Sequence, residues 1–381
     1  MNLIVVYSSR KGGHTYPAFS LYQNLRKEVK NCLLLNLLDV STLMDMGDRV
    51  GRWGDLKLRW IWKKGYKSLM TPKESLLDVA YKNFLKLFIG LSNAGRTFKN
   101  LLKEDKTTVV SIQPEINTFA ESLKKRTKNK LYFFTVIIDL AFHGLWKNRG
   151  IDLYFAPNKE VHQEILRFGI PPERVIVSGL PLRKEFKEVK KYSAKKIKEK
   201  LKIPPKSFVV LVIGGLLGKM IDYFKIINSL SEIRQSIEII VITGKNKEIY
   251  EKLKRERMKN LRVLGVVENM AEIMYAADLI VSKPGSVTIA ESLALGKPMV
   301  VITPLAGSYQ EIRFANYLTR NQAGVWIKNA EEASKKIEEI LKYKDYYKKL
   351  KYNAERIGSI HLSANQRIST KILNYIKKEE K

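Results

Sequence analysis

The chain has 381 residues, 45% of them hydrophobic, which allows two domains with a core each and excludes intrinsic disorder as a description of the whole chain. Its formal net charge of +31 at pH 7 predicts a polyanionic partner, either nucleic acid or the anionic surface of a membrane. A solvated, lysine-rich surface of a heat-stable protein is the alternative explanation of this charge. Cys32 is the only cysteine, which excludes an internal disulfide and fits a reducing compartment.

The apolar segments favour a protein without a membrane span. Residues 1–7 are too few for the core of a signal peptide and are predicted to form a strand. No apolar run approaches the roughly 20 residues of a spanning helix. The nearest, 131–146, is interrupted by Asp139 and His143. We therefore expect a cytoplasmic protein that associates peripherally with the inner face of the cell membrane.

The first half alternates short β-branched runs with longer amphipathic stretches, a pattern typical of parallel sheets with crossover helices. Residues 3–7 are predicted to be the first strand, 8–14 a polar loop with glycines, and 16–30 a helix. Further strands are expected at 33–37, 107–112, 132–138, 153–156 and 175–178. A lysine-rich linker follows at 186–205, in which Ser193 is a candidate N-cap for a short helix.

The second half repeats the scheme. Residues 207–213 are predicted to form a strand, 214–218 a glycine-rich turn and 219–230 a helix. More strands are expected at 238–243, 262–264, 279–282 and 299–302, and a last helix at 364–376. The sequence thus predicts an α/β protein of two Rossmann-like domains, 1–188 and 189–360, whose sheets face a cleft between them. Residues 361–381 are expected to pack back on the first domain. In open α/β sheets ligands bind beyond the carboxyl ends of the strands, where the glycine-rich turns fall.

The segment 282–298 carries the strongest local signal. A strand ends there, Gly285-Ser286 turn the chain, and a helix begins. Unpaired N–H groups and the positive end of the helix dipole make such a helix start a site for phosphate. Glu291 lies about one and a half turns further on, where a carboxylate can accept from ribose hydroxyls. A purely structural turn is the competing interpretation.

The amino-acid sequence of this segment, together with 304–311 and 321–324, resembles the C-terminal half of glycosyltransferase family 28. The resemblance implies a GT-B fold and a nucleotide-sugar donor bound mainly by the second domain. It implies donor-binding roles for the following residues: Gly214, Gly215, Gly218, Val267, Gly285, Ser286, Thr288, Glu291, Gln310 and Glu311.

The first half resembles the diacylglycerol enzymes of that family, the monogalactosyldiacylglycerol synthases and the processive diacylglycerol glucosyltransferases. Three stretches carry this resemblance: 8–14, 135–146 and 177–186. The chain departs from the family where Lys11 replaces a glycine, where the turn at 214–218 lacks small polar residues, and where Phe314 replaces an asparagine.

The chain contains no Asp-x-Asp motif, the usual metal site of many transferases. In line with the resemblance, we expect a metal-independent, inverting transferase that needs no cofactor. The leaving diphosphate would be stabilised by helix N-termini, by the turn at Gly214-Gly215 and by Arg183 or Lys219. Gly12 and Gly13, with Arg183, are the expected phosphate contacts between the domains.

Inversion requires a base for the acceptor hydroxyl. His14, between Gly-Gly and a helix, and Asp139, which interrupts an apolar strand, are the two candidates. A helix cap for His14 and a structural hydrogen bond for Asp139 are the alternatives.

A basic and aromatic stretch at 49–66 is predicted to bind anionic lipid headgroups, because cations attract the headgroups and indole rings prefer their depth. An amphipathic core helix is the alternative, and single-stranded nucleic acid a third possibility. The predicted membrane residues are Arg52, Trp53, Arg59, Trp60, Trp62, Lys63 and Lys64.

The resemblance implies transfer of a hexose from a UDP-sugar to a membrane lipid, with diacylglycerol the expected acceptor. Three alternatives stay open: a polyprenyl-linked or polysaccharide acceptor, a UDP-sugar epimerase, and a basic nucleic-acid-binding protein without catalysis.

Overall fold

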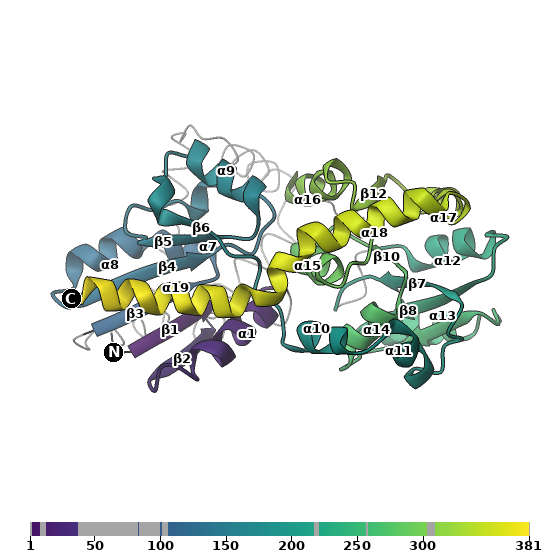
Figure 1. Cartoon of the computed structure of the whole chain (residues 1–381), viewed down its shortest axis with the longest axis horizontal. Coiled ribbons are helices and arrows are strands. Elements are labelled where there is room, and N and C mark those ends of the chain that lie inside the picture. Colours follow the sequence, from purple (N-terminus) through teal and green to yellow (C-terminus); the bar gives the residue numbers. More distant parts are fainter. Residues whose placement is uncertain are drawn as a thin grey trace. The chain divides into compact units, whose positions relative to one another are not determined.

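The computed structural model describes residues 2–7, 13–36, 83, 100, 106–216, 221–256, 258–302 and 309–380. The chain forms two compact units (Figure 1). Unit 1 consists of Met1–Leu182 and Ser363–Lys381, and unit 2 of Arg183–Leu362. The sequence had placed the boundaries after residues 188 and 360. The first crossing lies earlier because α10 (Glu185–Glu188) packs against α14 (Met270–Ala276) of unit 2.

Unit 1 contains a six-stranded parallel sheet in the order β2-β1-β3-β4-β5-β6. The order reverses between β1 and β3, so the carboxyl ends of these two strands form a switch point. The strands are β1 (Asn2–Tyr7), β2 (Cys32–Asn36), β3 (Lys106–Ser111), β4 (Lys130–Val136), β5 (Leu153–Ala156) and β6 (Val175–Val177).

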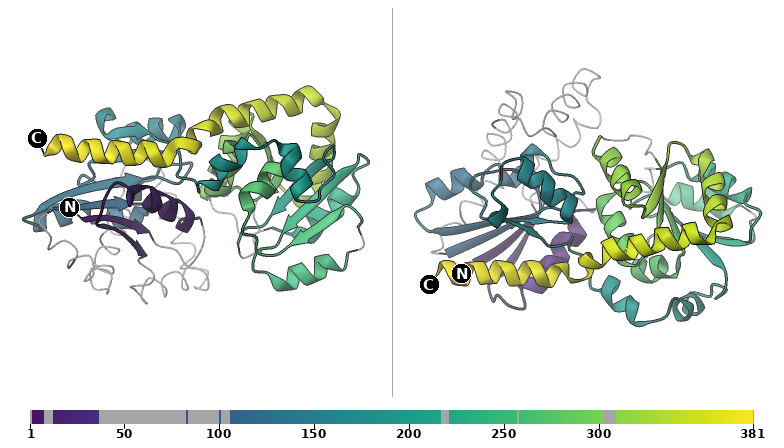
Figure 2. Two further views of the ribbon diagram at one scale, coloured as in Figure 1. Left: turned by 60° about the horizontal axis from the view of Figure 1, so that its bottom comes forward. Right: turned by 45° about the horizontal axis from the view of Figure 1, so that its top comes forward.

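The last helix, α19 (Ala364–Glu379), packs against α1 (Thr15–Leu25) and lies beside the sheet of unit 1 (Figures 1 and 2). Ile368, Ile372 and Ile376 recur every fourth residue and are buried, as expected for a helix with one apolar face. The other helical segments of unit 1 are α7 (Pro114–Asn117), α8 (Ala120–Arg126), η1 (Gly144–Trp146), α9 (Lys159–Arg167) and η2 (Pro172–Arg174).

Unit 2 contains a second six-stranded parallel sheet, in the order β12-β11-β10-β7-β8-β9. This is the doubly wound Rossmann order, with its switch point between β7 and β10. The strands are β7 (Phe208–Ile213), β8 (Ile237–Ile242), β9 (Leu261–Leu264), β10 (Leu279–Ser282), β11 (Met299–Ile302) and β12 (Gly324–Ile327).

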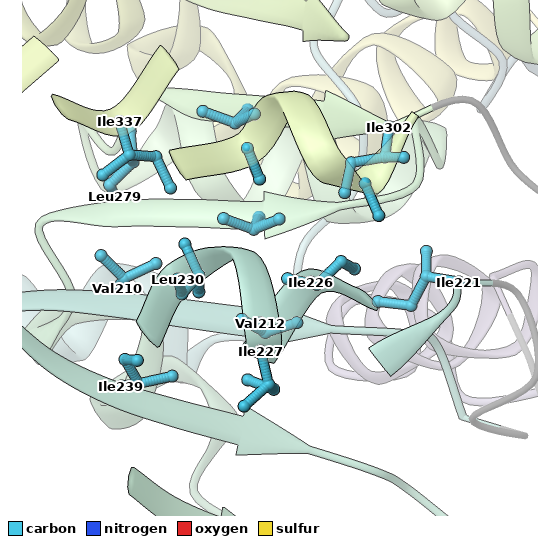
Figure 3. Packing of buried hydrophobic residues seen from close by; sticks show 14 of the residues in the cluster. Val210, Val212, Ile221, Ile226, Ile227, Leu230, Ile239, Leu279, Ile302 and Ile337 are labelled. Carbon is cyan, nitrogen blue, oxygen red and sulfur yellow. The ribbon is translucent and has the colours of Figure 1, made fainter. Parts of the chain in front are cut away.

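The helices of unit 2 cover a core of aliphatic side chains (Figure 3). The side chains of Val210 and Val212 on β7 and those of Ile226 and Leu230 on α12 pack in this core, at the interface between helix and sheet. Besides α10 and α14, the helical segments are η3 (Val189–Lys191), α11 (Ala194–Lys200), α12 (Tyr223–Ser231), α13 (Lys247–Lys254), α15 (Ser286–Ala294), α16 (Tyr309–Arg320), η4 (Ala330–Glu332), α17 (Ala333–Lys342), α18 (Lys344–Gly358) and η5 (Ser359–Ser363).

The predicted strands are confirmed within two residues, and three predicted helices differ at an end, among them α19, which extends to Glu379 instead of residue 376. Helix α1 ends at Leu25 instead of residue 30, because the amides of Glu28 and Val29 both bond to the Leu25 carbonyl and close a turn. Helix α12 begins at Tyr223, capped by Asp222, and not at residue 219. Strand β12 was not predicted, since its four residues begin with a glycine and are too few to show a periodicity. The predicted cap is confirmed: the Ser193 side chain accepts from the amide of Lys196 at the start of α11.

Among the described residues, no helix combines the length and the apolar character required to span a membrane.

Candidate functional site

The switch point of unit 2 brings two loops together. The Ser282 hydroxyl, at the end of β10, donates to the carbonyl of Ile213 at the end of β7 over 2.9 Å, and this bond is buried. The two strand ends are therefore fixed to each other, and the turns that follow them share one edge of the sheet. This is the position where doubly wound sheets bind ligands.

The turn after β7 consists of Gly214 and Gly215. A Cβ on Gly214 would clash with the hydroxyl of Tyr223, which is buried and donates to the carbonyl of Ile242 over 2.9 Å. Gly215 has φ +80°, a conformation that L-residues rarely adopt. Both glycines thus have a steric or conformational reason, whatever ligand binds there. Gly218 and Lys219 lie outside the described residues.

The turn after β10 is different, because neither a clash nor a positive φ requires a glycine at position 285. It is the N-cap of α15, with ordinary backbone angles of φ −88° and ψ 131°, and no side chain caps the helix. A Cβ built on Gly285 would lie 3.8 Å from both the Lys283 ammonium nitrogen and the Thr288 hydroxyl. An ammonium group, a hydroxyl and the N-terminus of a nine-residue helix, which begins at Ser286, therefore converge on one point. Such a convergence of donors favours an anion.

Lys283 is a residue of this site that the motif comparison missed. Its ammonium nitrogen lies 2.8 Å from Glu311 Oε1, in the first turn of α16. Gln310 precedes Glu311 and is half-buried. Phe314, the departure from the family pattern, is buried in the core. The sequence signal for Lys283 was its place between a buried strand and a Pro-Gly turn.

Glu291 is buried in α15 and lies 3.4 Å from a guanidinium nitrogen of Arg183. Burial raises the pKa of Glu291 to about 7, and the nearby charge of Arg183 opposes that rise. The carboxylate therefore changes its ionisation near neutral pH. Val267 follows β9 and is half-buried. Strand β8 lies between β9 and the switch point.

His14 lies at the switch point of unit 1. It is the N-cap residue of α1, but its side chain makes no capping hydrogen bond. Instead, ring atom Nδ1 lies 3.4 Å from the carbonyl oxygen of Ile112, directly after β3. The histidine thus bridges the loops after β1 and β3. Gly13 is exposed, and Gly12 lies outside the described residues.

Asp139 follows β4, and its carboxylate lies 3.8 Å from His143 Nε2. Both residues are buried, and the His143 ring packs near Trp146, with 6.0 Å between the ring centroids. Gln113, which sequence reasoning missed, follows the carbonyl that contacts His14. Its side-chain oxygen is buried and has no hydrogen-bond partner among the described residues.

Two further predictions are not addressed by these contacts. All seven predicted membrane residues, from Arg52 to Lys64, lie outside the described residues. In the part of the chain that the structure describes, no three His, Cys, Asp or Glu side chains gather as a metal site would require. Metal independence stays a prediction.

Two family descriptions match this chain, one in each unit. Residues 15–182 match monogalactosyldiacylglycerol (MGDG) synthase, and residues 209–368 match the glycosyltransferase family 28 C-terminal domain. A processive diacylglycerol beta-glucosyltransferase of Bacillus licheniformis is 25% identical over 96% of this chain and 93% of its own length. The protein of the same name from Bacillus cereus (strain AH187) is 27% identical over 89% and 85%.

Solved structures share the fold at low sequence identity. MurG of Acinetobacter baumannii has a TM-score of 0.60 and 16% identity, covering 98% of this chain and all of its own. HepE of Anabaena, solved in complex with UDP, has a TM-score of 0.57 and 16% identity with the same coverage. The fold is therefore GT-B, and each half of the chain matches a glycosyltransferase description, that of family 28 in the second half.

Proposed function

We propose that this protein is an inverting hexosyltransferase that moves a sugar from a UDP-sugar to a membrane lipid, with diacylglycerol as acceptor. One observation carries the donor half of the proposal. At the switch point of unit 2, Lys283, Thr288 and the N-terminus of α15 converge beside Gly285. The group that fits this convergence is a diphosphate. The names of the Bacillus relatives support diacylglycerol and glucose.

The nucleotide half of the donor is assigned to the same edge of the sheet. Glu291 lies in α15, the helix whose N-terminus would receive the diphosphate, and as a carboxylate it accepts hydrogen bonds from ribose hydroxyls. Gln310 and Glu311, at the start of α16, would then lie near the sugar, whose hydroxyls can donate to their oxygens. HepE structures that hold UDP or UDP-glucose support a uridine donor.

The acceptor half is assigned to unit 1. His14 and Asp139 both lie at carboxyl ends of strands, and one of them would take the proton of the acceptor hydroxyl. His143, beside Asp139, would stabilise the ionised carboxylate. Gln113 offers a buried oxygen that can accept from the same hydroxyl.

The test is a donor screen against mixed membrane lipids with the full-length protein. UDP-glucose, UDP-galactose and UDP-N-acetylglucosamine are supplied separately, and the lipid extract is analysed by mass spectrometry. A new hexosyl-diacylglycerol is expected with one of the three donors. Conversion of a donor in the absence of any acceptor would instead identify an epimerase, and a product on polyprenyl phosphate only would change the acceptor class.

Association with the membrane is proposed to be peripheral, through the stretch 49–66. Binding should then require anionic vesicles and weaken with salt, because screening shortens the reach of each charge. Replacing Trp60 and Trp62 by serine should lower vesicle binding and lipid turnover together, while UDP affinity stays constant. A double variant that keeps normal vesicle binding would contradict this role.

A further inference from the structure

We propose that the ammonium group of Lys283 binds the donor diphosphate and neutralises the charge that builds on it as the sugar leaves, with Glu311 positioning that ammonium. This inference rests on the proposed function and assigns its leaving-group cation. The sequence had offered Arg183 or Lys219 for this task.

Lys283 lies next to the helix start that would receive the diphosphate. Lys283 is the first residue after β10. A Cβ built on Gly285 would lie 3.8 Å from the Lys283 ammonium nitrogen and 3.8 Å from the Thr288 hydroxyl. Gly285 carries no side chain into this space, and its φ and ψ would suit any residue. The backbone there has no conformational need for glycine. A Cβ there would meet atoms of Lys283 and Thr288 at ordinary contact distances, so a phosphate oxygen beside this glycine can approach the ammonium, the hydroxyl and the helix N–H groups together.

Glu311 orients the side chain of Lys283. A lysine has a flexible stem and a strongly hydrated ammonium, so in water it samples many rotamers. Here Glu311 holds the ammonium at 2.8 Å, and the side chains of Glu311 and Lys283 are only 12% and 26% exposed. An ammonium has three N–H donors. One serves Glu311, and two remain for oxygens of the diphosphate.

The transfer reaction builds negative charge on the leaving diphosphate. In the transfer, the bond between the anomeric carbon and the diphosphate oxygen breaks, and its electron pair stays on the diphosphate. A lone pair of the acceptor oxygen forms the new bond, and the acceptor proton goes to the base in unit 1. The diphosphate therefore gains negative charge while Lys283 keeps its proton throughout. A cation preorganised at that place stabilises the transition state more than the ground state.

Arg183 and Lys283 both pair with a carboxylate, but the partner of Arg183, Glu291 at 3.4 Å, lies in the second turn of α15 and not at the helix start. That contact directs Arg183 toward a buried acid. Lys283 and Glu311, in contrast, sit directly at the helix start that receives the anion.

The competing explanation is that the Lys283–Glu311 ion pair only fastens α16 to the end of β10. The test compares Lys283→Met with Lys336→Met, since Lys336 also forms an ion pair in unit 2, at 2.6 Å from Glu339. Binding of UDP, UMP and uridine is measured by calorimetry, together with melting temperature and single-turnover rates. Lys283→Met should weaken UDP binding about tenfold or more and leave uridine binding unchanged, because only the phosphates lose a charged partner. Lys336→Met should change neither.

Turnover separates the two residues. Lys283→Met should lower kcat by about 10²-fold, the size of effect seen when one transition-state donor is removed. Glu311→Gln should lower kcat about tenfold with a small change in KM, since the ammonium remains but is held less firmly. Lys283→Arg should recover part of the lost rate. If Lys283→Met does not fold, Lys283→Gln, which keeps much of the stem, takes its place in every measurement.

Equal UDP affinity in wild type and Lys283→Met, with a lowered melting temperature, would overturn the inference and leave a structural ion pair. A loss of UDP and uridine binding in equal measure would also overturn it. Failure of the proposed function looks different: the wild-type protein itself would bind no UDP.

Discussion

The carboxyl ends of the two sheets present different chemistry, although both sheets are parallel and six-stranded. In unit 1, titratable side chains follow the strands: His14 after β1, and Asp139 with His143 after β4. In unit 2, the corresponding positions hold glycines, an uncapped helix start and a lysine. Under the proposed function, the first edge would take up a proton, and the second would bind an anion with backbone groups and a fixed charge.

Within unit 2, the two glycine turns differ in a similar way. Gly214 and Gly215 are required by the fold, through a clash with Tyr223 and a positive φ. Gly285 has neither constraint. A glycine that the backbone does not need is the better indication of a ligand.

The largest expected effect separates the two edges. Asp139→Asn removes the charge but keeps the shape, and should lower kcat on the order of 10²–10⁴-fold if Asp139 is the base. His14→Asn should do the same if the histidine is the base. UDP affinity should stay constant in both, because nucleotide binding is assigned to unit 2. The measurement is single-turnover glycolipid formation beside calorimetric UDP binding, with His162→Asn as control. Parallel loss of UDP binding would end the assignment of separate tasks.

The next effect sharpens the contrast between the glycine turns. Gly285→Ala places a methyl group at ordinary contact distance from its neighbours, 3.7–3.8 Å, so the melting temperature should hold. The same methyl occupies the anion's space, and UDP should bind about tenfold more weakly, the loss of one charge-assisted hydrogen bond. Gly214→Ala should show the opposite order, a lower melting temperature first. A destabilised Gly285→Ala with unchanged UDP affinity would contradict the distinction.

A smaller, pH-dependent effect is expected from Glu291. Its pKa is raised from 4.5 to about 7, so the folded protein holds this proton more tightly than the unfolded chain. Between those values the folded state binds more protons, and the contribution of Glu291 to stability falls as pH rises. Glu291→Gln should abolish this contribution. Between pH 5 and pH 8, the melting temperature of the wild type should therefore fall by more than that of the Glu291→Gln variant.

The same titration should appear in binding. Ribose hydroxyls donate to an ionised carboxylate more strongly than to a neutral acid, so uridine affinity should rise a few-fold as pH increases through 7. Uridine titrations at pH 6 and pH 8 check this, with Glu291→Gln as the pH-insensitive control. Identical pH dependence in both proteins would exclude Glu291 as the titrating group.

Removal of divalent metal ions is expected to leave activity unchanged. If Lys283 and the helix N-terminus neutralise the diphosphate, activity should survive dialysis against EDTA. Loss of activity that manganese or magnesium restores would mean that a divalent ion supplies the charge, and Lys283 would then lose its assigned task.

The sequence by itself determined the parallel α/β halves, since alternating β-branched and amphipathic runs encode which faces are buried within each short segment. It also located the helix that starts at Ser286 and the two strand-end residues His14 and Asp139. The tertiary structure alone decided the partners. Arg183 meets Glu291 across 108 residues of sequence, and Lys283 meets Glu311 across 28. Local periodicity carries no information about such pairs, because their contact depends on how strands and helices far apart in the chain pack at one edge of a sheet.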